Sequence, residues 1–121
     1  MSTHKDLDVW KDSILLAKKV YEFTENVPRR EEFGLAAQMR KSAVSIGSNI
    51  AEGAARRGNK EFLQFLYVAL GSASELDTQL EIALLVNLIP AESAADLTKD
   101  LSAISRMLQG LIRSIKAPSK K

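Results

Sequence analysis

Seven basic residues around one polar stretch are the side chains of this chain best suited to bind phosphate. They are Arg29, Arg30, Arg40, Lys41, Arg56, Arg57 and Lys60. Arginine suits phosphate because its planar guanidinium offers parallel donors. No aromatic residue lies within the basic runs themselves, so the sequence does not indicate stacking on nucleic-acid bases. Two interpretations stay open, namely a phosphate-binding nucleic-acid interface and an ordinary solvated basic surface.

A stripe of uncharged and charged polar residues lies between these basic runs. At 3.6 residues per turn, one face of a helix would carry Gln38, Ser42, Ser45, Asn49, Glu52 and Arg56. Serine and asparagine lower helix propensity, so simple exposure to water does not explain them. The stripe is typical of a helix that faces another protein surface or a ligand. We expect a structural polar layer made of Gln38, Ser45, Asn49, Glu52, Glu75 and Gln79. Within it, Glu75 or Gln79 would hydrogen-bond to Arg40 or Asn49.

Catalytic chemistry has weaker support in the sequence. Glu52 and Glu75 could act as a general acid and base, but Glu52 precedes Arg56 by four residues, which favours a helical ion pair. The chain has one histidine, His4, so neither a di-metal bundle site nor a Ser-His-Asp triad is expected. The glycine-containing segment 53–60 follows a helical pattern rather than a strand, which argues against a phosphate-binding loop. We therefore predict no enzyme, no metal site and no cofactor.

Composition places the chain among globular proteins of one domain, spanning residues 1–121. It is 45% hydrophobic and 26% charged, values that exclude wholesale disorder. The absence of cysteine excludes a disulfide framework and thiolate metal sites. No apolar run approaches membrane-spanning length, and the first residues lack the apolar core of a signal peptide. We expect a cytoplasmic protein without membrane contact.

The net charge of +2 hides an uneven distribution along the chain. Residues 29–60 carry a net charge of +4 and residues 102–121 one of +5, whereas residues 61–101 carry −6. Basic and acidic segments could neutralise each other within the fold or between subunits, or leave a basic face for phosphate.

Helical periodicity covers nearly the whole chain, and no strand pattern is present. The pattern predicts helices over residues 6–24, 31–57, 60–87 and 91–115, with a frayed tail at 117–121. The three prolines, Pro28, Pro90 and Pro118, each fall where a helical pattern begins or ends. Four long amphipathic helices joined by short turns predict an all-α fold, an antiparallel up-down-up-down four-helix bundle.

The last helix shows the narrowest apolar stripe, which we expect to face the core. It consists of Leu97, Leu101, Ile104, Leu108, Leu111 and Ile115. The first and third helices have wider apolar arcs than a bundle core needs, with Leu63, Tyr67 and Leu70 outside the main stripe of the third. Surplus apolar surface favours self-association, although scattered exposed apolar residues are also normal in monomers.

The chain resembles the four-helix-bundle proteins encoded by intervening sequences of bacterial 23S ribosomal RNA genes. The most specific match is the run Ser48-Asn49-Ile50-Ala51-Glu52-Gly53. Further matches are Trp10, Tyr21, Phe33-Gly34-Leu35, Gln38, Arg40, Ser45-Ile46, Phe62, Gly71-Ser72, Glu75-Leu76 and Gln79-Leu80. Lys41 and Gly47 stand where the family pattern has arginine and proline.

This resemblance implies a left-handed bundle that assembles into a homopentamer, without enzymatic activity. It also implies kinship with accessory proteins of reverse transcriptases in diversity-generating retroelements, whose basic surface engages nucleic acid. Our leading hypothesis is a non-enzymatic oligomer that associates with structured RNA through the seven basic residues. The alternative is a protein-interaction adaptor, for example for a reverse transcriptase, with no direct nucleic-acid contact.

Overall fold

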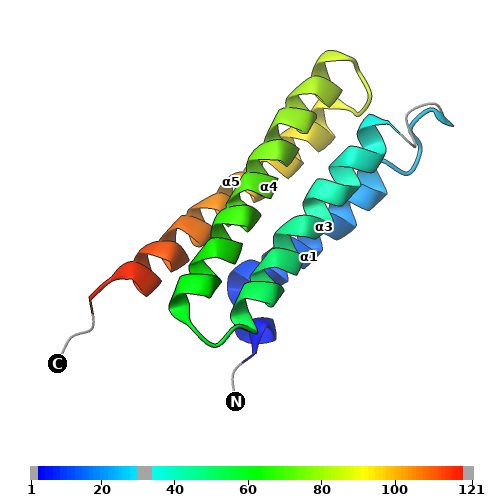
Figure 1. The fold of residues 1–121 in the computed structure, drawn as a ribbon. Coiled ribbons are helices and arrows are strands. Elements are labelled where there is room, and N and C mark those ends of the chain that lie inside the picture. Colours follow the sequence, from blue (N-terminus) through cyan, green and yellow to red (C-terminus); the bar gives the residue numbers. More distant parts are fainter. Residues whose placement is uncertain (1–2, 30–33, 119–121) are drawn as a thin grey trace.

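The computed structural model describes residues 3–29 and 34–118 and consists of helices joined by short connections (Figure 1). Its elements are η1 His4–Asp6, α1 Asp8–Phe23, α3 Leu35–Ala54, α4 Asn59–Leu85 and α5 Ala91–Lys116. The predicted helices are thus confirmed, with boundaries that differ by a few residues, and the predicted start of the second at residues 31–33 lies outside the described residues. Of the predicted frayed tail, residues 119–121 lie outside the described residues.

The four long helices form an antiparallel bundle in which each packs against two neighbours. Helix α1 contacts α3 and α5, and α4 contacts the same two helices. In the described part of the chain, the diagonal pairs α1–α4 and α3–α5 make no comparable contact. Successive helices run in opposite directions, so the turn between α3 and α4 and the end of α5 lie at the same end of the bundle (Figure 1). The predicted up-down-up-down arrangement is confirmed.

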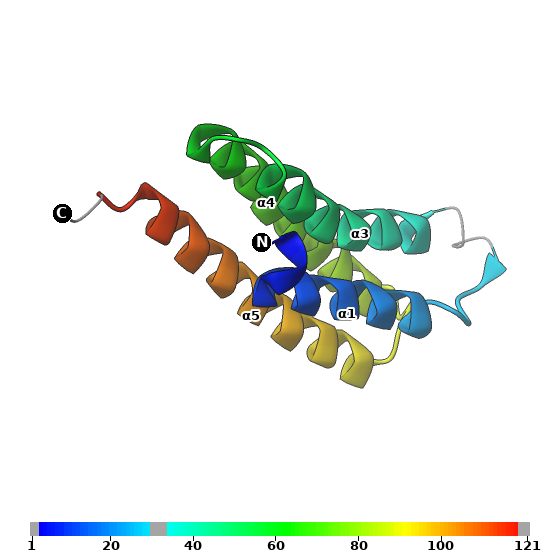
Figure 2. The same cartoon turned by 90° about the horizontal axis from the view of Figure 1, so that it is seen from below.

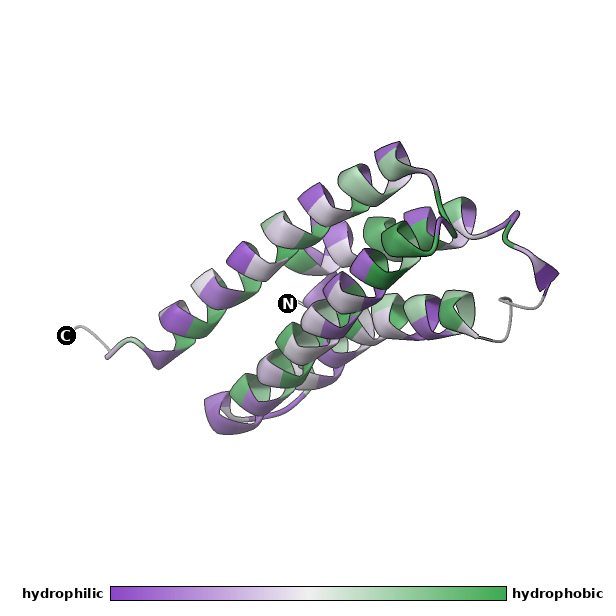
Figure 3. Cartoon of the chain, turned by 90° about the horizontal axis from the view of Figure 1, so that it is seen from above, coloured by the Kyte–Doolittle hydropathy of each residue, from purple (hydrophilic) through white to green (hydrophobic). Residues whose placement is uncertain are grey.

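Each helix turns its apolar stripe inward, as the hydropathy colours in Figure 3 show. On α5, the predicted core residues Leu97, Leu101, Ile104 and Leu108 are all buried. Leu111 and Ile115 also pack against the core but are only half-buried, whereas Ile112, which was not predicted, is buried. The last turns of α5 extend past the start of α1 (Figure 2), so α4 is the neighbour that remains beside Ile112. The side of α5 that faces α4 is therefore the side that is covered.

Helices α3 and α4 approach each other closely at Gly53, which is buried. A Cβ atom placed on Gly53 would lie 2.8 Å from Phe65 Cβ, 2.9 Å from Phe62 Cδ1 and 3.2 Å from the Phe62 carbonyl oxygen. These distances are shorter than van der Waals contact. Glycine therefore allows the last turn of α3 to pack directly on the first turns of α4.

A charged cluster joins the first and last helices. Lys19 Nζ lies 2.6 Å from Asp100 Oδ2 and 3.1 Å from Asp96 Oδ2. The hydrogen bond to Asp100, followed by the bond to Asp96, raises the pKa of the Lys19 ammonium above its ordinary value. This half-buried cluster connects α1 to α5 across a sequence separation of about eighty residues.

The surplus apolar surface on α4 differs from the one expected. Leu63 and Leu70 pack against the core at its edge, so the bundle itself uses them. Tyr67 is exposed, as expected, and the other large apolar side chains left exposed on and just after α4 are Val68, Ile82, Leu84, Leu85 and Val86. On α1, the exposed apolar residues are Ile14, Leu15 and Tyr21. None of the helices in the described ranges is both long enough and apolar enough to cross a membrane.

Candidate nucleic-acid interface

Arg40 has a structural position that the sequence analysis did not anticipate. Its Nε donates to Thr24 Oγ1 and its Nη2 to the Thr24 carbonyl oxygen, both at 2.9 Å. The guanidinium also lies 5.2 Å from the centre of the Tyr21 ring. Since Thr24 ends α1, these bonds satisfy carbonyl and hydroxyl groups at that helix end. Arg40 thus ties α1 to α3, and two of its donors are engaged within the bundle.

The turn between α3 and α4 presents three of the predicted basic residues. Arg56 is engaged within the chain, because its Nη2 lies 3.1 Å from Glu52 Oε2 and its Nε 3.9 Å from Glu61 Oε2. Its guanidinium also covers the Phe65 ring at 5.0 Å. Arg57 and Lys60 are exposed, and neither forms an ion pair with another described residue. They are therefore better placed than Arg56 to bind an anion.

Antiparallel packing brings the last turns of α5 to the same end of the bundle (Figure 1). Arg113 and Lys116 are exposed there. We call the group of Arg57, Lys60, Arg113 and Lys116 the basic end. Its members come from two segments more than fifty residues apart in the sequence. The positive charge of residues 102–121 was visible in the sequence. That Arg113 and Lys116 lie at the same end as the α3–α4 turn depends on helix direction.

The remaining predicted basic residues lie elsewhere. Arg29 and Lys41 are both exposed near the other end of α3, and Arg30 lies outside the described residues. At a rise of 1.5 Å per residue, Lys41 is roughly 20 Å from the α3–α4 turn. The seven predicted residues therefore do not form one continuous patch.

The polar stripe of α3 turns toward α4. Ser45 Oγ and Ser72 Oγ lie 2.8 Å apart, which links the two helices. Asn49 Nδ2 donates to the Ser45 carbonyl oxygen at 2.8 Å and to Ser45 Oγ at 2.9 Å. Ser72 was not among the predicted layer residues, although it belongs to the Gly71-Ser72 match. The side-chain hydrogen bond between α3 and α4 depends on the Ser72 hydroxyl.

The expected bond from Glu75 or Gln79 to Arg40 or Asn49 is absent from the described residues. Arg40 points to α1 instead, and Asn49 binds back to its own helix. Glu75 is exposed and has no side-chain hydrogen bond within the described chain. Gln79 is half-buried, and its Oε1 atom is shielded from water without a hydrogen-bond partner in the described structure.

These residues share one outer surface with several small or apolar positions. We define the α3/α4 face as Gln38, Ser45 and Asn49 of α3 together with Val68, Gly71, Glu75, Gln79 and Ile82 of α4. Gln38 and Gly71 are exposed, and a Cβ atom on Gly71 would meet nothing within 4 Å. Val68 and Ile82 expose 51% and 44% of their surface, which is high for aliphatic side chains on one face.

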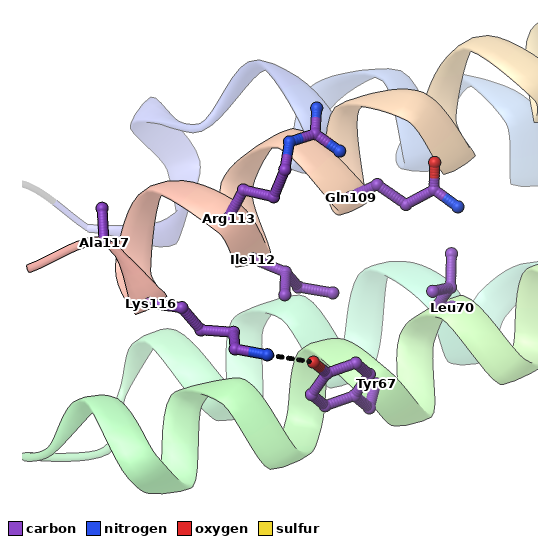
Figure 4. Close-up of a pocket in the computed structure, with 7 residues that line it drawn as sticks. All are labelled: Tyr67, Leu70, Gln109, Ile112, Arg113, Lys116 and Ala117. Atoms are coloured by element: carbon purple, nitrogen blue, oxygen red, sulfur yellow. Dashed lines mark hydrogen bonds between the residues drawn. The ribbon is translucent and has the colours of Figure 1, made fainter.

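A hollow lies between α4 and α5 beside the basic end (Figure 4). It has a volume of about 410 Å³ and is lined by Tyr67, Leu70, Gln109, Ile112, Arg113, Lys116 and Ala117. Lys116 Nζ donates a long hydrogen bond of 3.5 Å to the Tyr67 hydroxyl oxygen. Leu70 and Ile112 supply apolar surface between the helices. The fold thus places an aromatic ring beside Lys116, which is 49 residues away in sequence.

No arrangement typical of catalysis occurs among the residues that the structure describes. Glu52 is bound to Arg56, and both carboxylates of the predicted pair, Glu52 and Glu75, are exposed. His4 makes an edge contact with the Trp10 ring, with 5.0 Å between ring centres. No cluster of three or more histidine, aspartate or glutamate side chains could hold a metal ion within residues 3–29 and 34–118.

Comparison with known proteins agrees with this fold and assigns no activity. A crystal structure of a protein of unknown function from the S23 ribosomal protein family, from Bacteroides thetaiotaomicron, is 28% identical to the chain. It matches with a TM-score of 0.79 over 87% of this chain and 95% of that one. Among curated proteins, none is significantly similar. The sequence pattern of one family matches residues 5–110, and no catalytic family is indicated. The chain therefore belongs to the 23S rRNA-intervening sequence protein family.

Proposed function

We propose that the protein is a non-enzymatic, oligomeric bundle that binds structured RNA at its basic end. The observation that carries this proposal is the convergence of Arg57, Lys60, Arg113 and Lys116 at one end. Cations of this kind bind the phosphate backbone without reading sequence, because counterions released from the nucleic acid supply the free energy. RNA is the polyanion to test first, because the family is named for the intervening sequence of 23S rRNA genes that encodes its members.

Removing two cations of the basic end should weaken RNA binding and its dependence on salt. For the double variant Arg57→Ala, Lys60→Ala, we expect the slope of log Ka against log salt to become shallower by about two, one per lost phosphate contact. Fluorescence anisotropy with a labelled RNA hairpin, between 50 and 200 mM salt, measures this slope.

A matched control comes from the other end of the bundle. Arg29→Ala, Lys41→Ala removes the same charge from exposed positions outside the basic end. It should leave the slope nearly unchanged. Equal losses in the two double variants would mean that net charge, and not the basic end, governs binding. Absence of RNA binding by the unaltered protein at low salt would exclude the proposed function.

The oligomeric part of the proposal depends on the α3/α4 face. Glycine in the interior of a long helix is unfavourable by about 1 kcal/mol, and nothing within 4 Å requires it at position 71 of the single chain. A second copy that packs closely on Gly71 accounts for this cost. It would also cover the exposed side chains of Val68 and Ile82.

Assembly should fail when a long side chain fills this face. We expect Gly71→Arg to sediment as a folded monomer at micromolar concentration, where the unaltered protein sediments as an oligomer, by our proposal a pentamer. Position 71 is exposed and arginine is a good helix former, so the bundle itself should keep its helical circular dichroism.

The conservative variant Gly71→Ala serves as the control for this prediction. Its single methyl group has open space within the chain and should preserve at least part of the assembly. Analytical ultracentrifugation of all three proteins gives the comparison. A monomer in the unaltered protein, or an unchanged oligomer in Gly71→Arg, would show that this face does not mediate self-association.

A second candidate function is that of a protein-interaction adaptor, for example for a reverse transcriptase. The observation in its favour is the apolar tip at the end opposite the basic residues, where Leu85 and Val86 are 79% and 61% exposed. Such surface is costly to leave in water and is typical of protein contacts. Normal RNA binding by the variant Leu85→Ser, Val86→Ser would separate this tip from the basic end.

A further inference from the structure

The hollow between α4 and α5 combines apolar surface, an aromatic ring and cationic side chains. Its floor is apolar, formed by Leu70 and Ile112. The half-exposed ring of Tyr67 lies on α4, and Lys116 reaches its hydroxyl from α5 (Figure 4). Arg113 also lines the hollow from α5, with its guanidinium directed away from the ring. No carboxylate lines the hollow. Its lining is therefore complementary to a flat, partly apolar group that carries negative charge.

An unpaired nucleotide has these properties in one molecule. A base stacks on aromatic rings irrespective of sequence, because every base has a π face, while arginine and lysine bind the adjoining phosphate. The Gln109 side chain, which offers both a donor and an acceptor, can bond to base edges. A volume of about 410 Å³ falls within the size range of small-ligand pockets.

We propose that this hollow binds one unpaired nucleotide of an RNA, with the base stacked on Tyr67 and its phosphate held by Lys116 and by Arg113, whose exposed side chain turns toward the hollow on binding. The inference rests on the proposed RNA binding and adds a local preference for single-stranded segments. Duplex RNA cannot present a base to the ring without unpairing it. The basic end alone binds phosphate in either form, whereas the Tyr67 hollow distinguishes between them.

The test compares two RNA probes on three proteins. The probes are a labelled ten-nucleotide oligo(U) strand and a labelled RNA duplex of equal length. We expect Tyr67→Ala to weaken binding of the single strand about tenfold and to leave binding of the duplex unchanged. Tyr67→Phe retains the ring and loses the hydroxyl that accepts from Lys116. It should bind both probes like the unaltered protein.

Competition separates a bound nucleotide from bound phosphate. Uridine monophosphate should displace oligo(U) from the unaltered protein at lower concentration than inorganic phosphate does, and this advantage should vanish in Tyr67→Ala. Equal potency of the two competitors on the unaltered protein would overturn stacking at Tyr67.

The remaining outcomes distinguish this inference from the function on which it rests. If the unaltered protein binds oligo(U) and Tyr67→Ala binds it equally well, the nucleotide site is wrong and the basic end still stands. If the unaltered protein binds neither probe at low salt, the proposed function itself fails. If Tyr67→Ala changes the sedimentation coefficient, the hollow belongs to a contact between copies, and the inference is overturned.

Discussion

The Leu108→Ala variant is expected to lose about 2–5 kcal/mol of its free energy of unfolding. Leu108 has no exposed surface and lies in the central stripe of α5. Truncation removes buried methyl groups and leaves a cavity that the surrounding helices fill only in part, because helix packing is nearly as dense as an organic crystal. Urea unfolding followed by circular dichroism measures the loss, at one fixed protein concentration because assembly also contributes to stability.

The same substitution at an exposed leucine provides the comparison. Leu85 is 79% exposed, so Leu85→Ala should change the free energy of unfolding by no more than about 0.5 kcal/mol. A loss below about 1 kcal/mol at Leu108 would mean that α5 does not turn this side chain into the core. The difference between the two variants isolates burial from the general effect of replacing leucine.

The second large effect is expected at Gly53, where adding a methyl group should destabilise the bundle. Alanine normally stabilises a helix relative to glycine by about 1 kcal/mol. At Gly53 that gain is outweighed, because the new Cβ would lie within 3 Å of carbon atoms of both Phe62 and Phe65. Since Phe65 Cβ and the Phe62 carbonyl are close to or part of the backbone, α3 and α4 must move apart. We expect a net loss of about 1–3 kcal/mol in urea unfolding.

Gly110 offers a matched glycine within a helix of the same bundle. A Cβ atom there would meet Arg113 Nη2 at 3.8 Å, an ordinary van der Waals distance. Gly110→Ala should therefore raise the free energy of unfolding by about 0.5–1 kcal/mol. If Gly53→Ala were also stabilising, the close packing of α3 on α4 would be incorrect.

The helices and most of the core could be predicted from periodicity alone. Apolar spacing located Leu97, Leu101 and Leu108 correctly, because a helix with one covered side repeats its apolar residues every three or four positions. Ile112 could not be assigned this way. Its burial depends on which helix still packs against α5 near its end. The sequence of α5 alone does not show how far the neighbouring helices extend.

The candidate site was harder to predict, because its geometry depends on pairing between helices. Charge alone could not separate Arg40, which binds Thr24, from Arg57, which faces solvent. Stacking appeared unsupported because no aromatic residue lies within the basic runs. The antiparallel register of α4 and α5 nevertheless places Tyr67 beside Lys116. That proximity follows from helix length and direction, which residue spacing along the chain does not encode.

The bonds between Arg40 and Thr24 close the segment of chain between these two residues into a loop. The two residues are 16 positions apart, and their side-chain and carbonyl contacts hold the two ends of the intervening segment together. In terms of loop-closure entropy, doubling such a segment costs only about 0.6 kcal/mol, because the cost grows with the logarithm of length. We therefore expect the α1–α3 connection to tolerate insertions at little cost in stability. The bonds from Arg40 to Thr24 would still hold the end of α1 against α3.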